Sequence, residues 1–177
     1  YRDGTDEWFK FLGVTSRYHG KSYPHEVLNR DAGHPIMRTF SPGWWNPAGE
    51  LYHVERIWPS AHALGSTKNQ ETGQEEICVW VNEYQGRTRV FGTTLGHHNE
   101  TVSAPAFLDL VTRGTLWAAN KLNDEYLKAP VHPLAAVNLA LGKPASASST
   151  QPGHPPGDGA DDRSDSRWCA NGPQKDE

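Results

Sequence analysis

The sequence predicts an α/β protein, with strands that are covered by a helix, and two observations carry that prediction. Two runs of β-branched and aromatic residues, Glu76 to Tyr84 and Arg87 to Leu95, are separated by Gln85-Gly86, which is typical of a β-hairpin. An amphipathic stretch with apolar residues at helical spacing follows, from Ser103 to about Tyr126. Strands followed by such a helix favour a layered α/β architecture.

The other predicted elements are shorter. Residues Thr5 to Leu12 predict a helix that begins on a threonine cap and ends at Gly13. Residues Gly49 to Trp58 alternate in a pattern that favours one strand. We expect the strand Val90 to Leu95 to lie in the centre of the sheet, with the long helix packed on it. The helix face expected to be buried consists of Phe107, Leu110, Val111 and Ala118.

Composition divides the chain near residue 130. All tryptophans except Trp168, and all Phe and Tyr, precede Leu127, whereas residues 145–159 are almost all small or polar. Two prolines in residues 128–133 indicate a linker. We therefore expect a domain at 1–127, a linker at 128–137 and a further segment at 138–177. Because the chain begins with Tyr rather than Met, we also expect it to be an internal piece of a longer polypeptide.

Charge, hydropathy and cysteine content argue against several classes of function. The 177 residues carry 17 Lys and Arg against 21 Asp and Glu, a net charge of -4, so no basic footprint for nucleic acid is present. No apolar run approaches the ~20 residues that a membrane-spanning helix needs. Cys78 and Cys169 are too far apart in sequence for a paired-cysteine metal or redox motif. We interpret Cys78, inside an apolar strand, as a small buried side chain.

Polar side chains gather where the last predicted strand ends. The segment Gly96-His97-His98-Asn99-Glu100-Thr101 lies between that strand and the long helix. Ligands of open α/β sheets bind beyond the carboxyl ends of strands, so we expect this loop to line a ligand site. A structural alternative remains open, in which Asn99 or Thr101 caps a turn and one histidine bonds to the backbone.

Two further candidates lie earlier in the chain, at Tyr18-His19 and at Glu50. Together, His19, Glu50 and His97 offer either ligands for a divalent metal or an acid/base set for sugar chemistry. Spacing alone does not show that the three side chains meet. Trp44-Trp45 and Trp58 offer either sugar stacking or core packing, and we favour core packing.

Five segments resemble the carboxyl-terminal half of the ThuA-like, or trehalose-utilisation, family: GVTSRYHG (13–20), GHPIMRTF (33–40), GELYHVERIWP (49–59), RVFGTTLGHHNETV (89–102) and LVTRGTLWA (110–118). The resemblance covers most of residues 1–127. It implies a flavodoxin-like open sheet of the class I glutamine-amidotransferase type and a role in the metabolism of oxidised or keto-form disaccharides. It also implies that an amino-terminal half is missing here.

The resemblance assigns roles to individual residues. It implies that His97, His19 and Glu50 are catalytic, with His19 and His97 as the ligands of any divalent metal. The resemblance also places Tyr52 in the site, and because Tyr18, His98, Asn99 and Glu100 lie in the same polar segments as the two histidines, we expect all five residues to contact the substrate. No nucleophile-elbow cysteine occurs in this stretch, so glutamine hydrolysis is not supported.

A second resemblance begins at Asn138. The segments NLALGKPASASST (138–150) and GADDRSDSRWCA (159–170) resemble the start of a discoidin-type module, a carbohydrate- or lipid-binding jelly roll. It implies a calcium ion at Asp161, although Asp162 stands where the family has glycine. About 40 residues are too few for the complete all-β module. Such a module implies an extracytoplasmic or secreted protein.

Three hypotheses about function follow. The first is a sugar-processing enzyme that uses His19, Glu50, His97 and His98. The second is a non-catalytic carbohydrate-binding protein, which would use aromatic platforms and neutral hydrogen-bonding groups. The third is a structural remnant whose missing half supplies the site. A catalytic site requires titratable side chains held close together, so the relative positions of His19, Glu50 and His97 distinguish the hypotheses.

Overall fold

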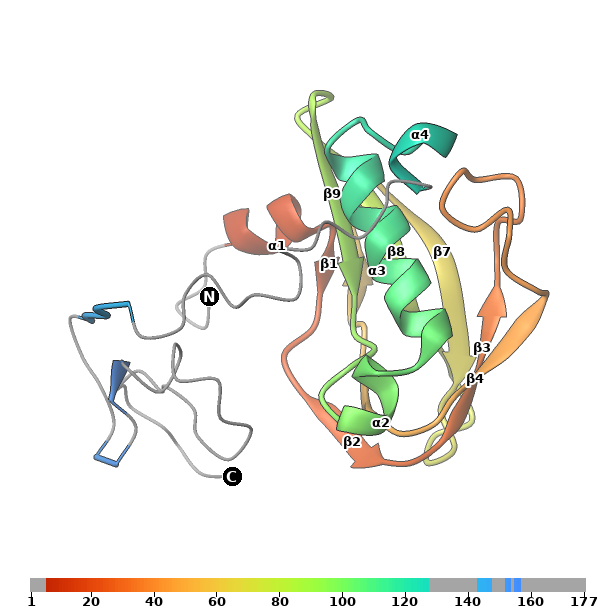
Figure 1. The fold of residues 1–177 in the computed structure, drawn as a ribbon. Coiled ribbons are helices and arrows are strands. Elements are labelled where there is room, and N and C mark those ends of the chain that lie inside the picture. Colours follow the sequence, from red (N-terminus) through yellow and green to blue (C-terminus); the bar gives the residue numbers. More distant parts are fainter. Residues whose placement is uncertain (1–5, 128–142, 148–151, 154, 157–177) are drawn as a thin grey trace. The chain divides into compact units, whose positions relative to one another are not determined.

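A five-stranded sheet with the order β4-β3-β7-β8-β9 is the largest element of the computed structural model (Figure 1). Its strands are β3 (His25–Asn29), β4 (Gly43–Asn46), β7 (Ala61–Lys68), β8 (Glu75–Tyr84) and β9 (Thr88–Thr93). Two small ribbons pair β1 (Val14–Thr15) with β6 (Arg56–Ile57), and β2 (His19–Ser22) with β5 (Glu50–Tyr52). The helices are α1 (Glu7–Leu12), α2 (Asn99–Val102), α3 (Pro105–Ala118) and α4 (Asp124–Leu127).

The structure describes residues 6–127, 143–147, 152–153 and 155–156. The chain divides into two units, Tyr1–Lys128 and Ala129–Glu177, and the helices and strands named above belong to the first. The predicted linker at 128–137 and the predicted calcium ligand Asp161 lie outside the described residues. None of the described helices is both long enough and apolar enough to cross a membrane.

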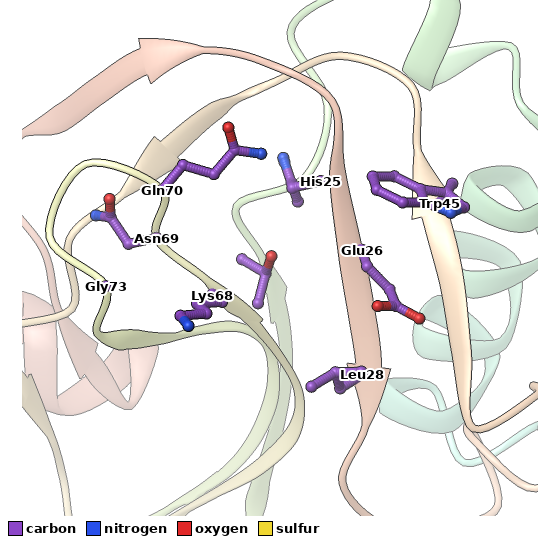
Figure 2. A pocket seen from close by; sticks show the side chains of 9 residues that line it. His25, Glu26, Leu28, Trp45, Lys68, Asn69, Gln70 and Gly73 are labelled. Atoms are coloured by element: carbon purple, nitrogen blue, oxygen red, sulfur yellow. The ribbon is translucent and has the colours of Figure 1, made fainter.

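The two faces of β3 and β4 have different characters. Val27 is paired with Trp44, and Glu26 is paired with Trp45. Val27 and Trp44 belong to or pack against the core. Because successive side chains of a strand point to opposite faces, Glu26 and Trp45, which are labelled in Figure 2, face outward. The expectation of core packing was therefore wrong for Trp45, which is 67% exposed.

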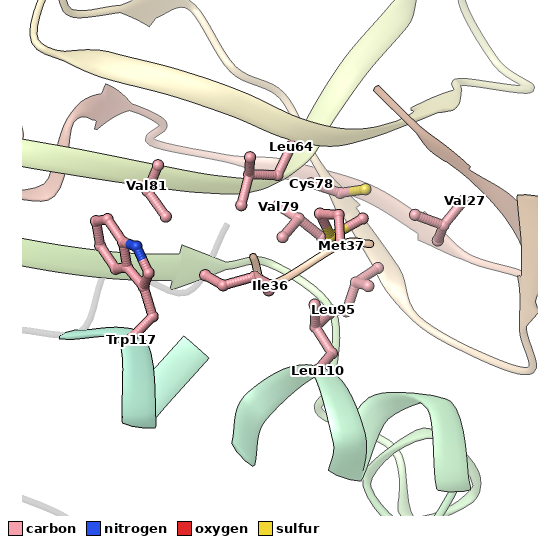
Figure 3. Close-up of a cluster of buried hydrophobic side chains, with 10 residues drawn as sticks. All are labelled: Val27, Ile36, Met37, Leu64, Cys78, Val79, Val81, Leu95, Leu110 and Trp117. Atoms are coloured by element: carbon pink, nitrogen blue, oxygen red, sulfur yellow. The ribbon is translucent and has the colours of Figure 1, made fainter. Parts of the chain in front are cut away.

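The core lies between the sheet and α3 (Figure 3). Its buried members are Val27, Ile36, Met37, Leu64, Cys78, Val79, Val81, Leu95, Leu110 and Trp117. Of the predicted helix face, Leu110 is fully buried, whereas Phe107 and Ala118 are partly buried against the cluster and Val111 is half-buried. Helix α3 therefore covers the sheet as the spacing predicted.

Strand direction and order differ from the prediction. The predicted hairpin is confirmed as β8 and β9, with Gln85 and Gly86 both at positive φ in the turn. Short turns join antiparallel neighbours, whereas parallel pairs need long crossovers, and all pairs among the described strands are antiparallel. The described residues therefore form an α/β fold without the parallel pairs of a flavodoxin-like layer. Strand β9 lies at the edge of the sheet, so its predicted central place was wrong.

Two predicted elements are interrupted. The long helix ends at Ala118 rather than near Tyr126, because Asn120 adopts a left-handed φ of 56° and Asn123 Oδ1 accepts the backbone N–H of Tyr126 to start α4. The single strand predicted from Gly49 to Trp58 is divided into β5 and β6. Between them, the backbone N–H of Val54 donates to the Glu76 carboxylate instead of to a neighbouring strand.

Candidate functional site

The ribbon of β2 and β5 brings His19 and Glu50 together. His19 is in register with Tyr52, and their ring centroids lie 5.1 Å apart. Glu50 is two residues before Tyr52, so its side chain shares the same face of the strand. The distance between His19 Nε2 and Glu50 Oε2 is 3.7 Å. The pairing of these two strands therefore places an imidazole beside a carboxylate.

The loop after β9 brings His97 to the same carboxylate. The distance between His97 Nδ1 and Glu50 Oε2 is 3.5 Å. Two consecutive positive φ angles, 129° at Gly96 and 75° at His97, turn the chain at this point. A positive φ is uncommon for a residue with a side chain and is a recurrent feature of functional sites. The three residues predicted from the sequence, His19, Glu50 and His97, thus meet around one oxygen atom.

A second contact fixes the loop against the turn that precedes β5. The buried hydroxyl of Thr101 accepts the backbone N–H of Ala48 at 3.3 Å and donates to the carbonyl oxygen of the same residue. A Cβ placed on Gly49 would lie 3.9 Å from the carbonyl oxygen of Gly96, so the two segments are in contact. These contacts fix the relative positions of the two backbone segments that carry Glu50 and His97.

His98 extends the site toward β2. Its Nε2 atom lies 3.3 Å from Ser22 Oγ, and its ring centroid lies 4.9 Å from that of His97. Its Nδ1 atom is buried and has no hydrogen-bond partner among the residues that the structure describes. Ser22 was not predicted, because it reaches this position only through the register shift between His19 and Ser22 in the β2–β5 pair.

Burial and nearby charges shift the pKa values of three residues, Tyr52, His25 and Cys78. Burial, followed by the nearby Glu50 carboxylate, raises the pKa of Tyr52, so its phenol carries a proton at neutral pH. Burial lowers the pKa of His25. The Nδ1 atom of this residue donates to the carbonyl oxygen of Tyr23 at 3.1 Å. Burial raises the pKa of the Cys78 thiol, as its interpretation as a buried apolar side chain predicts.

Three other predicted residues do not join this cluster. Tyr18 packs its ring 4.7 Å from that of His53, next to the buried Glu76, and so faces the other side of the ribbon. Asn99 and Glu100 are exposed on α2. The structural alternative holds in part for Thr101: no side-chain hydrogen bond caps the start of α2, whose N-cap is His98, but the Thr101 hydroxyl bonds the backbone of Ala48 in the turn before β5.

Metal ligation and acid/base chemistry were the two alternatives for His19, Glu50 and His97. Among the described residues, no group of three or more His, Cys, Asp or Glu side chains is arranged to hold a metal ion. Two imidazoles beside one carboxylate oxygen are also an arrangement that acid/base chemistry can use, with the carboxylate orienting a ring.

Comparisons with known proteins identify relatives of the chain. Residues 1–118 match the family described as ThuA, trehalose utilisation. The chain is similar to the solved structure of a ThuA-like protein from Parabacteroides merdae, with 24% identity and a TM-score of 0.53 over 62% of this chain and 49% of that one. A second ThuA-like structure, from Bacteroides uniformis, has 21% identity and a TM-score of 0.57 over 72% of this chain and 59% of that one.

The chain thus spans only about half the length of these two proteins, and at such identities the similarity shows the fold alone. No curated protein matches the sequence. The family match covers two thirds of the chain and includes the segments that carry His19, Glu50 and His97. The protein therefore belongs to the ThuA, or trehalose-utilisation, family.

Proposed function

We propose that this protein is a carbohydrate-processing domain in which His19, Glu50 and His97 form an acid/base site for a disaccharide or keto-sugar. Membership of the trehalose-utilisation family points to carbohydrate chemistry. The observation that carries the proposal is the meeting of the two imidazoles at one carboxylate oxygen, at 3.7 and 3.5 Å.

The exposure of the three side chains suggests which role each of them has in the reaction. His97 is the most exposed, at 63%, and therefore accessible to a sugar, whereas Glu50 is 21% exposed and lies behind it. Histidine is the usual proton carrier near neutral pH, so His97 is the proposed group that exchanges a proton with a sugar hydroxyl or carbonyl. Glu50 orients His97, and His19 is the second acid/base group.

Neighbouring groups provide hydrogen bonds for the sugar. The protonated phenol of Tyr52 lies next to His19, and the ring of His98 lies next to that of His97. Distances in an unliganded site often shorten when the substrate binds, so separations of about 3.5 Å are compatible with proton transfer.

The finer fold assignments are part of the same proposal. The described antiparallel sheet is one part of a larger fold of the glutamine-amidotransferase type, whose flavodoxin-like parallel strands a further part of the polypeptide supplies. Residues 138–177 begin a discoidin-type module with Asp161 as a calcium ligand, and the protein acts outside the cytoplasm. The sequence resemblances support these assignments, and the first is also supported by the share of the ThuA-like relatives that the chain covers, 49% of one and 59% of the other.

Turnover of a keto-disaccharide by matched histidine variants of the full-length polypeptide tests the proposal. His97→Ala should lower kcat/KM by about 10²-fold or more and leave the free energy of unfolding nearly unchanged. His62→Ala is the matched control, because His62 is also exposed and paired with a carboxylate, that of Asp31 at 2.9 Å, but lies outside the site. Equal activity of both variants would refute the catalytic assignment and favour the non-catalytic alternative.

A further inference from the structure

A groove of about 520 Å³ lies on the outer face of the sheet, between β3, β4 and the loop that joins β7 to β8 (Figure 2). Its apolar wall is formed by Trp45 and Leu28. Its polar side chains include Glu26, Lys68 and Gln70. The volume falls within the range of roughly 300–1,000 Å³ that is usual for small-molecule sites, and the lining is mixed rather than uniformly apolar.

Trp45 is the most unusual residue of the groove. Its indole is 67% exposed, although its neighbour Trp44 packs against Phe40 with a centroid distance of 4.9 Å. The side chain of Glu26, paired with Trp45 across the strands, lies over Gly43, where an added Cβ would be only 2.6 Å from Glu26 Oε1. An aromatic ring with one free face and a carboxylate beside it are thus held on the same pair of strands.

The far wall of the groove is ordered by its own hydrogen bonds. The side-chain oxygen of Asn69 accepts the backbone N–H groups of Glu71 and Thr72, and Gln70 donates from its side-chain amide to the carbonyl of Pro24. These bonds hold the loop after β7 against the start of β3. The Lys68 and Gln70 side chains are therefore presented from a wall that is formed before a ligand arrives.

The charges of the lining select the class of ligand. Glu26 and Lys68 carry opposite formal charges that cancel, and burial lowers the pKa of the third titratable group, His25, so that it is neutral at pH 7. A groove without net charge that combines an aromatic plane with hydrogen-bonding groups fits a neutral ring with many hydroxyls better than an anion or a cation.

We propose that this groove is a binding site for a neutral saccharide. The C–H face of one sugar ring packs on the indole of Trp45, and the ring's hydroxyls bond to Glu26 and Gln70. The groove is separate from His19, Glu50 and His97, and saccharide binding there does not depend on the function proposed for those residues.

Calorimetric titration of the full-length polypeptide with trehalose, maltose and cellobiose tests the proposal, with glucuronic acid and glucosamine as charged comparators. At least one neutral disaccharide should bind more tightly than either charged sugar. Trp45→Ala should weaken that binding about tenfold or more, because it removes the aromatic anchor, whereas Trp45→Phe should retain most of it. Trp8→Ala is the matched control, since Trp8 is an exposed tryptophan on α1 and should leave the affinity unchanged.

A further variant distinguishes binding in this groove from binding at the histidine cluster. His97→Ala should bind the disaccharide as tightly as the wild type, even if its turnover is lost. Absence of binding by all three neutral disaccharides, unchanged affinity in Trp45→Ala, or loss of binding in His97→Ala would overturn the proposal.

Discussion

Glu50, at the start of β5, and His97, in the loop after β9, lie 3.5 Å apart, and a neighbouring contact between Thr101 and Ala48 fixes the distance between these two segments. The side chains of the candidate site therefore depend on a backbone contact that carries no chemistry itself. The proposed chemical role of Glu50 and His97 and the structural role of Thr101 can therefore be tested by separate substitutions.

Thr101→Val should lower the free energy of unfolding by about 1–3 kcal/mol, because it removes the hydroxyl and leaves the polar groups of Ala48 without their partner. It should also lower kcat/KM, because Glu50 and His97 lose their fixed separation. Denaturant unfolding and turnover measure the two effects. Thr101→Ser keeps the hydroxyl and is the control. Equal losses in both variants would show that the methyl group, rather than the hydroxyl, is what matters.

Leu110→Asp should cost about 3 kcal/mol or more, because it places an unpaired carboxylate in the core between α3 and the sheet. Leu108→Asp is the matched control, since Leu108 lies on the same helix but is 51% exposed, and it should change stability by less than about 0.5 kcal/mol. Thermal unfolding of both variants measures the difference. If Leu110→Asp were as stable as the wild type, the packing of α3 against the core would be contradicted.

Gly114→Ala should be destabilising, although the same change in an exposed helix stabilises by about 1 kcal/mol. A Cβ at Gly114 would overlap ring atoms of Phe91, so α3 and β9 would have to separate, at a cost of about 1–3 kcal/mol. Thr112→Ala, on the exposed side of the same helix, should be neutral or slightly stabilising. Thermal unfolding compares the two variants, and a more stable Gly114→Ala protein would contradict the close packing of α3 on β9.

Stability should fall as the pH is lowered below about 6.5, the usual pKa of histidine. Burial lowers the pKa values of His25 and His34, so the unfolded chain takes up protons at a pH where the folded protein does not. Stability is therefore complete above about pH 6.5 and is lost toward the lower pKa values of the folded state. Denaturant unfolding across this range should show a smaller slope for His25→Gln between about pH 6.5 and 5, and a curve parallel to the wild type above about pH 7. If the slope of stability against pH were the same in His25→Gln as in the wild type, His25 would not be a source of the pH dependence.

The sequence predicted those parts of the fold in which local pattern and tertiary structure agree. The β8–β9 hairpin has strong strand formers around a glycine turn, and α1 ends at Gly13, which adopts a φ of 92°. Strand β7 was missed because AHALGSTK has weak strand propensity and becomes a strand by pairing on both sides. Its Gly65 is needed there, since a Cβ would lie 3.1 Å from Val79.

The candidate site was predictable in part. His19, Glu50 and His97 were identifiable because each follows a turn or a strand end, but their meeting depends on the pairing of β2 with β5 and on two positive φ angles. Ser22 carries no local signal. The exposure of Trp45 was also unpredictable, because Trp44 and Trp45 are the same residue type and only the register with β3 decides which of them faces the core.

Glu50 and His97 should act as one unit, and a double-mutant cycle on kcat/KM for a keto-disaccharide tests this most directly. The cycle compares Glu50→Gln, His97→Ala and the double variant in the full-length polypeptide. Because each residue works through the other, each single change should remove most of the activity, and the double variant should be no slower than the slower single variant. A double variant whose loss equals the product of the two single losses would show that the residues act independently and would contradict the shared site.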